Sequence, residues 1–414
     1  MISRMGIRGL VGVLAVATGC YAPSIDVCLY HCDTGGGCPN GLVCNGGNWC
    51  AADKDMSCDG ILDAKRDTGA GCVWHDVSNV DPCAQQFDTV MGDWSIAPTD
   101  VVTVNTNAGT VTHAATGVVF PSTGVLTTID QLAGGDRVFV IAVHDLTMQG
   151  PINVMGSLPV LFMVNGTAMI SSDVIVSASS VKTDCAGGLG GSTTTPQGTG
   201  GGGGGAFAGA GGSGGAGGIA SGNAALVGSA GVPLVGSPLM LVPLRGGCRG
   251  GAGGVLENTG APGGPSGGGG GAIQISARVE LVVGGTIRAN GNPGGSAMSS
   301  PESGGGGGGA GGGILLEAPT VIISGKLCAI GGGGGANQGN GSVSNCVGPG
   351  AGGSTGTSNG NGGNGGDGTT PAQAGVAGLS FSTPTGGGGG GGGAGVIRVR
   401  GAFSGTGTIA PPRT

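Results

Sequence analysis

Uninterrupted blocks of glycine constrain this chain more than any other feature of its sequence. Glycine occupies 105 of the 414 positions, and blocks of five to eight glycines recur at 200–205, 267–271, 304–309, 331–335 and 386–393. Glycine has no side chain to bury, and it loses much backbone entropy when it is ordered. The apolar core therefore has to come from the segments between the blocks.

Those intervening segments favour a β-rich fold. Val and Ile recur in dense short runs, which argues against disorder, although only 9% of the residues are charged and 3% are aromatic. A collagen-like chain needs glycine at every third position along its length, and that period is absent. The net charge of −7 and the lack of any basic run exclude nucleic acid as a partner.

Apolar runs repeat at fixed intervals. Segments 137–143 and 158–164 begin 21 residues apart, and a period near 21 is about one turn of a parallel β-helix. The runs in 272–291 recur 41 residues later in 313–330, and a truncated copy begins at Gly395. The sequence predicts a mainly β fold for residues 85–414, a right-handed parallel β-helix or solenoid with glycine-rich inserts near 186–271, 291–312 and 331–393.

The glycine blocks admit two states. They can be disordered fringes, or they can pack side by side as extended rods of the polyproline-II type, because backbones without side chains approach closely. Their regular placement between the strand groups favours packing.

The N-terminus predicts export. Arg4 and Arg8 precede an apolar stretch, residues 10–17, that is too short to span a bilayer, as in a secretory signal over residues 1–19. The following Ala17-Thr18-Gly19-Cys20 resembles the bacterial lipobox, with Ala17 where Leu is commonest. This resemblance implies that Cys20 is lipidated, and Tyr21 implies sorting to an outer membrane. The alternative is an ordinary secretory signal.

The cysteines predict disulfides. Setting aside Cys20 leaves an even number, as expected in an oxidising compartment. We expect four bridges among the first eight, and Cys185–Cys248 and Cys328–Cys346 among the rest; the twelve are Cys28, Cys32, Cys38, Cys44, Cys50, Cys58, Cys72, Cys83, Cys185, Cys248, Cys328 and Cys346. Zinc bound by Cys28, His31, Cys32 and Cys38 is the alternative, but this spacing matches no familiar zinc module.

Residues 20–84 read as a separate disulfide-rich module. All the Trp and Tyr residues precede residue 95, so the chemistry of the chain changes there. The segment 38–44 resembles the small Cys-rich repeats of secreted and lipid-anchored bacterial proteins.

One acidic loop in this module is a candidate calcium site. Asp55, Ser57, Asp59 and Asp63 place oxygen ligands at alternating positions around Gly60, which resembles an EF-hand-like calcium loop. The loop departs from that pattern because Arg66 stands at the twelfth position. The alternative is a solvated acidic loop.

No motif predicts catalysis, and we assign no catalytic residue. Gly-x-Gly-x-x-Gly matches are inevitable in this composition, and no helical period follows them. Charged residues on the predicted strands are candidates for a polysaccharide-active β-helix, and Glu280 and Glu317 fall near equivalent repeat positions; the full set is Asp145, Asp173, Arg278, Glu280, Glu317 and Lys326.

The alternation of glycine blocks and strand groups resembles glycine-rich, lipid-anchored proteins of myxobacteria. The resemblance implies a non-enzymatic lipoprotein of the outer membrane or cell surface with a structural, adhesive or matrix-interaction role. Its partners would be the membrane, through the lipid anchor, and matrix polysaccharide or a surface protein. The alternatives are a carbohydrate-binding or carbohydrate-cleaving β-helix and, last, an ice-binding solenoid, because threonine is scattered.

Overall fold

The chain divides into two compact units, Met1–Asp67 and Thr68–Thr414. The computed structural model describes residues 43–44, 50–51, 72–74, 77–114, 120–177, 184–193, 197–219, 227–235, 237–297, 300–336, 338–346, 348–354, 360–378 and 384–414. In the first unit, β1 (Val43–Cys44) pairs antiparallel with β2 (Cys50–Ala51). Among the described residues, helix is limited to the 3₁₀ turns η2 (Phe87–Thr89) and η3 (Ser237–Met240).

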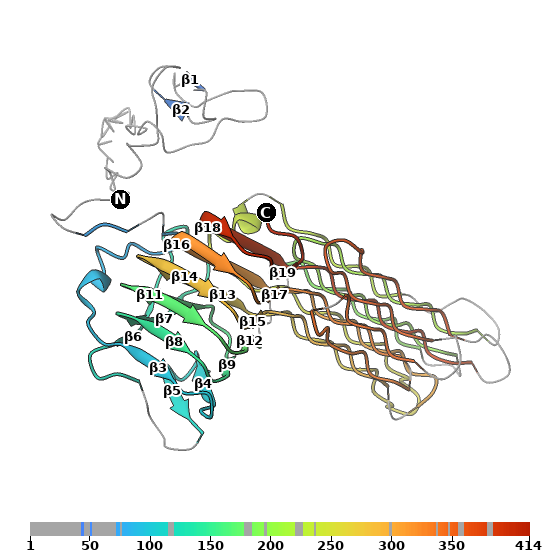
Figure 1. The fold of residues 1–414 in the computed structure, drawn as a ribbon. Coiled ribbons are helices and arrows are strands. Elements are labelled where there is room, and N and C mark those ends of the chain that lie inside the picture. The colour runs from blue at the N-terminus through green and yellow to red at the C-terminus, as the bar shows by residue number, and fades with distance from the viewer. Residues whose placement is uncertain are drawn as a thin grey trace, which may run out of the picture. The chain divides into compact units, whose positions relative to one another are not determined.

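The second unit is mainly β, with curled sheets (Figure 1). Most of its strands follow one another in groups that we call layers, and each layer pairs in parallel with the next. The strands are β3 (Trp94–Ile96), β4 (Val102–Asn105), β5 (Thr110–His113), β6 (Val125–Ile129), β7 (Val138–Val143), β8 (Leu146–Met148), β9 (Ile152–Met155), β10 (Val160–Val164), β11 (Thr167–Ile170), β12 (Val174–Val176), β13 (Ala272–Ala277), β14 (Glu280–Val283), β15 (Thr286–Arg288), β16 (Gly313–Ile323), β17 (Lys326–Cys328), β18 (Val396–Ser404) and β19 (Thr408–Ala410).

The register between layers follows the sequence repeat. Val160 of β10 lies opposite Phe139 of β7, which is the expected interval of 21 residues. Gly313 of β16 lies opposite Ala272 of β13, which is the interval of 41, and Val396 of β18 lies opposite Gly313. The strands on either side of the long glycine-rich inserts therefore stay aligned with the repeat, apart from a shift of one residue within β16 between Glu317 and Thr320.

The sheets are mixed rather than purely parallel. Strand β5 folds back on β4 as an antiparallel hairpin, and β6 pairs antiparallel with β7. Both strand pairs have short connections, which suit antiparallel pairing, whereas parallel pairing needs a longer crossover.

Two apolar clusters contain nearly all of the buried apolar side chains of the described strands. One cluster lies between the sheets and includes Ile141, Phe162, Ile275 and Leu316. The other covers the opposite face of β7, β10, β13 and β16. Because both faces are buried, β7 and β10 are continuous apolar runs, whereas strands with one exposed face alternate.

The second unit begins earlier than the sequence indicated. Trp74, Val77 and Val80 are buried in the outer cluster, and the Cys72–Cys83 disulfide lies beside them. Residues 72–84 were expected in the Cys-rich module, but their apolar side chains pack on the sheet. The structure therefore places the boundary near Asp67.

The glycine-rich inserts form a bundle of extended rods beyond the sheets (Figure 1). In the rod 198–206, three successive N–H groups donate to three different rods, from Gly201 to Gly215, from Gly202 to Gly305 and from Gly203 to Gly188, each at 2.9 Å. Gly204 then returns to the first of these rods, at Gly212. This period of three is that of a polyproline-II helix, which has no internal hydrogen bonds.

The same rod also accepts hydrogen bonds from three further rods. Gly228 donates to the carbonyl of Gly201, Gly390 to that of Gly202 and Gly251 to that of Gly203. Its backbone groups are thus satisfied on all sides, as buried backbone groups need to be. Of the two states that the sequence allowed, the described blocks take the packed one.

One disulfide joins two rods of the bundle, and another joins a glycine-rich insert to the sheets. Cys185 pairs with Cys248, which joins rods 184–193 and 246–255, and Cys328 of β17 pairs with Cys346 of the following insert. These are the two pairings expected from the sequence. Cys44 is also disulfide-bonded, whereas Cys28, Cys32, Cys38 and Cys58 lie outside the described residues.

Candidate functional site

Several residues singled out in the sequence lie outside the described part of the chain. These are the lipidation candidate Cys20 and the calcium candidates Asp55, Ser57, Asp59 and Asp63. Both assignments stay predictions. The charged strand residues, the glycine rods and one cluster at a sheet corner lie within the described part.

Glu280 and Glu317 do not occupy equivalent positions. The long strand β16 pairs with both β13 and β14 of the preceding layer. Glu317 therefore lies opposite Ser276 of β13, and Glu280 of β14 lies opposite Thr320. The expectation that the two carboxylates fall near one repeat position was wrong, because the repeat places Ser276 and Glu317 together. Glu280 is partly exposed, whereas Glu317 is 1% exposed.

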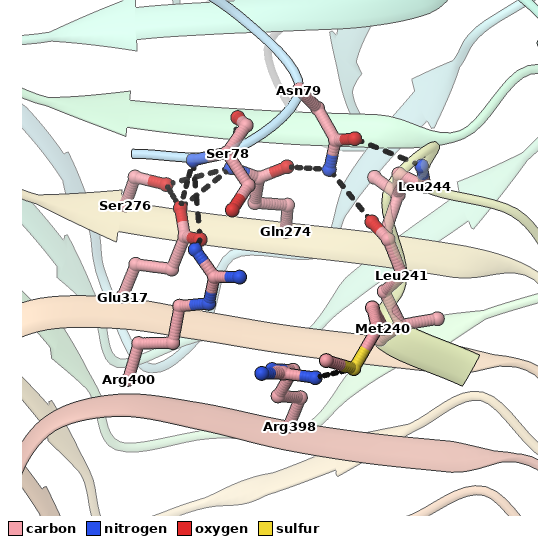
Figure 2. A network of polar contacts seen from close by, with 10 residues as sticks. All are labelled: Ser78, Asn79, Met240, Leu241, Leu244, Gln274, Ser276, Glu317, Arg398 and Arg400. Atoms are coloured by element: carbon pink, nitrogen blue, oxygen red, sulfur yellow. Dashed lines mark hydrogen bonds and ion pairs between the residues drawn. The ribbon is translucent and has the colours of Figure 1, made fainter. Parts of the chain in front are cut away.

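Glu317 is the centre of a buried polar network (Figure 2). Its carboxylate accepts hydrogen bonds from the Ser78 N–H at 3.0 Å and from Gln274 Nε2 and Ser276 Oγ, both at 2.8 Å. Arg400 Nη1 lies 3.8 Å away. Burial raises the pKa of Glu317, and the charge of Arg400 and the hydrogen bonds from Ser78 and Ser276 partly offset that rise.

The network continues through amide side chains. Asn79 Nδ2 donates to Gln274 Oε1 and to the Leu241 carbonyl, both at 2.9 Å, and Asn79 Oδ1 accepts from the Leu244 N–H at 3.2 Å. These contacts fasten residues 77–80 and 241–244 to the outer face of β13 and β16. Because the carboxylate is fully covered, we interpret the network as a structural clamp.

The exposed sheet face carries a row of polar residues in register. Thr167 of β11 lies opposite Glu280 of β14, which lies opposite Thr320 of β16. Asp145, one residue before β8, belongs to the same row. Neighbouring strands lie about 4.8 Å apart, so Asp145 and Glu280, with β11 between them, are about 10 Å apart at their backbones.

Two of the three other charged candidates, Asp173 and Arg278, have local partners. Asp173 Oδ2 lies 3.2 Å from Arg288 Nη2, and Arg278 Nη1 donates to Asn165 Oδ1 at 3.0 Å. Lys326 is exposed at the start of β17. A small cavity near the base of the rods is lined mainly by apolar and small residues, with Asp136 as its ionisable side chain.

One corner of the exposed sheet brings together residues that the sequence analysis did not group. His144 Nδ1 lies 3.0 Å from Asp93 Oδ1 and 3.4 Å from Asp145 Oδ2. Asp93 is 51 residues from His144 in sequence, and the parallel pairing of β3 with β8 brings them together. The repeat did not reveal this cluster, because its residues come from two different layers, next to β3 and next to β8.

The glycine rods differ in where side chains are allowed. The inner rods contain the uninterrupted blocks 200–205, 304–309 and 386–393, and all these glycines are buried. A Cβ at Gly203 would lie 1.8 Å from the Ser229 carbonyl oxygen, and one at Gly392 would lie 1.9 Å from that of Gly309. An inner rod therefore accepts only glycine at these positions.

The outer rods follow a Gly-Gly-X pattern. In 210–218, the third positions are Ala210, Ser213 and Ala216, and these are the residues with solvent exposure while the glycines that follow each of them are buried. In 246–255, the third positions are Arg249, Ala252 and Val255. This local period of three marks the packed rods in the sequence, although no chain-wide collagen period exists.

None of the described helices is long and apolar enough to cross a membrane. No family model, no curated protein and no solved structure matches this chain.

Proposed function

We propose that this chain is an exported, non-enzymatic lipoprotein of the outer membrane or cell surface, with a structural, adhesive or matrix-interaction role. Cys20 would carry the lipid after removal of residues 1–19, and acyl chains in combination give stable anchoring. This proposal includes the likeness to the glycine-rich lipoproteins of myxobacteria.

The glycine bundle is the observation that carries the proposal. Its inner rods are joined by backbone hydrogen bonds on every side, as for Gly202 with Gly305 and Gly390. Such a body is long, stiff and poor in reactive side chains, which suits a spacer or a contact surface. Its outer third positions, such as Ala210 and Ser213, present small side chains to the surroundings.

We further propose that the strand layers belong to a right-handed parallel β-helix that supports this bundle. The in-register parallel pairing of β7, β10, β13 and β16 supports this interpretation. The Cys-rich module would act as a stalk or a protein-binding knob.

Expression of the full chain in a Gram-negative host tests the anchor. We expect labelled palmitate to be incorporated and to be lost in Cys20→Ala, and we expect external protease to digest the protein on intact cells. Incorporation that persists in Cys20→Ala would contradict the lipid anchor, and full protection of the chain from the protease would contradict exposure at the cell surface.

Binding to extracellular matrix polysaccharide tests the role of the bundle. Gly203→Val places a side chain against the Ser229 carbonyl and should weaken binding, whereas Ala210→Val alters an exposed position of an outer rod. Equal binding by wild type, by both variants and by a chain without residues 184–395 would show that the bundle has no part in adhesion.

The second candidate is a carbohydrate-binding or carbohydrate-cleaving protein. The in-register row of Asp145, Thr167 and Glu280 on an exposed sheet favours it, because glycoside hydrolysis uses carboxylates about 5–10 Å apart. Release of reducing ends from a polysaccharide by wild type, and its loss in Glu280→Gln, would replace the structural role with an enzymatic one.

A further inference from the structure

We propose that Asp93, His144 and Asp145 form a binding site for one divalent transition-metal ion, for which Zn²⁺ is the best match. The residues meet where the chain enters β3 and where it passes from β7 to β8. One imidazole nitrogen and two carboxylate oxygens lie within 4.8 Å of one another. Zn²⁺ accepts such nitrogen and oxygen ligands, with water in the remaining position. This site is independent of the proposed surface role.

The distances fit an ion between the three side chains. His144 Nδ1 is 3.0 Å from Asp93 Oδ1 and 3.4 Å from Asp145 Oδ2. Around a tetrahedral ion with bonds of about 2.0–2.1 Å, neighbouring ligand atoms are about 3.3–3.4 Å apart. Small rotations of exposed side chains therefore complete the geometry. The imidazole ligand favours Zn²⁺ over Ca²⁺ and Mg²⁺, which prefer oxygen.

The backbone holds the three residues in place. The His144 N–H donates to the Gly92 carbonyl at 2.9 Å, and the Trp94 N–H donates to the Asp145 carbonyl at 2.8 Å. These two bonds join the segment around Asp93 to the corner that contains the other two ligands. The entropy cost of metal binding is thereby reduced, because the folded chain already holds the backbone of all three ligands in place.

The carboxylate of Asp145 is also oriented. Its Oδ1 accepts a hydrogen bond from the Thr167 N–H at 2.7 Å, which turns Oδ2 toward His144. A side chain at position 166 would prevent this, because a Cβ on Gly166 would lie 2.1 Å from Asp145 Oδ1. The glycine and the threonine amide together direct one free oxygen into the cluster.

The charge of the cluster suits a dication. With a neutral imidazole the cluster carries two negative charges, which a divalent ion neutralises. In the neighbouring layers Arg278 donates to Asn165 rather than to either aspartate.

Isothermal titration of the full-length, disulfide-intact chain with ZnCl₂ tests the proposal. We expect wild type to bind one more equivalent of Zn²⁺ than His144→Ala, and we expect Asp93→Asn and Asp145→Asn to weaken that equivalent at least tenfold. Glu280→Gln, on the same sheet face but outside the cluster, should bind like wild type. Millimolar CaCl₂ should not displace the ion.

The same variants give a second readout. Zn²⁺ should raise the thermal midpoint of wild type and of Glu280→Gln, and this rise should shrink in the three cluster variants. Because the Asp93 side chain is 68% exposed, Asp93→Asn is expected to fold even where another variant does not. Equal stoichiometry and affinity in wild type and in Asp93→Asn, or displacement by Ca²⁺, would overturn the proposal.

Discussion

Replacing one inner-rod glycine with alanine tests the packing of the bundle most directly. A Cβ at Gly307 would lie 2.0 Å from the Gly203 carbonyl oxygen, whereas ordinary contact begins near 3.4 Å. The rod that contains Gly307 therefore has to move about 1.4 Å away from its neighbour, or distort, although all the glycines of its block are buried. The methyl group has no free space to enter.

That displacement breaks identifiable hydrogen bonds. The Gly202 N–H donates to Gly305, and the Gly205 N–H donates to Gly308, both at 2.9 Å across the same pair of rods. Each buried N–H that loses its partner costs about 1–3 kcal/mol. Replacing glycine by alanine lowers the conformational entropy of the unfolded chain, which offsets about 0.4–1 kcal/mol of this loss of stability. We expect Gly307→Ala to lower the free energy of unfolding by ~3 kcal/mol.

Urea denaturation and amide hydrogen exchange of the bundle glycines measure this loss. The matched control is Gly284→Ala, because a Cβ there would have its nearest neighbours at 3.8 Å and the glycine is exposed. We expect the control to change stability by no more than about 0.5 kcal/mol. Equal stability and equal exchange protection in the two variants would refute close packing of the rods.

Three other perturbations separate the roles of the buried carboxyl, the disulfides and the outer rods. Burial raises the pKa of Glu317 above 4.5, so at a pH between 4.5 and the raised value the folded chain holds a proton that the unfolded chain has released. The free energy of unfolding should therefore fall as the pH rises from 4.5 through the raised value. The free energy of unfolding of Glu317→Gln, measured by urea denaturation, should not show this fall. Replacing both cysteines of Cys185–Cys248 by serine should lower the free energy of unfolding by about 4 kcal/mol, and replacing those of Cys328–Cys346 should lower it by about 3 kcal/mol, because the two bridges close loops of 63 and 18 residues. A larger loss of stability for Cys328–Cys346 than for Cys185–Cys248 would contradict the explanation by loop entropy. Ser213→Val, at an outer third position, should change the thermal midpoint little, and a large drop would mean that this position is buried.

The strand layers could be predicted from the sequence because their signal is local and repeated. Short β-branched runs such as 137–143 and 158–164 recur at the interval that the structure uses as its register. The pairing of Cys185 with Cys248 was also foreseeable, because pairing Cys328 with Cys346 left these two cysteines to tie off the other long insert. The spacing of apolar residues reflects which side chains are buried, so it was sufficient to predict the strand layers.

The candidate sites were harder to predict, because they depend on which strands become neighbours. Glu280 and Glu317 have similar sequence surroundings, yet one faces solvent and the other lies under residues 77–80. Asp93 meets His144 only through the pairing of β3 with β8. The 41-residue repeat does place Glu317 opposite Ser276, but the cover over Glu317 and the meeting of Asp93 with His144 are not encoded in spacing along the chain.

The sequence alone determined that the glycine segments either stay loose or pack as bare backbones, since a residue without a side chain offers no third choice. Only the tertiary structure showed that the uninterrupted blocks form inner rods and that the Gly-Gly-X segments form outer rods. The reason is steric: a Cβ at Gly203 meets a neighbouring carbonyl, whereas Ser213 faces outward. Whether a given position can carry a side chain depends on how many neighbouring rods surround it. The number of neighbouring rods is set by the assembly of the bundle and not by the local sequence.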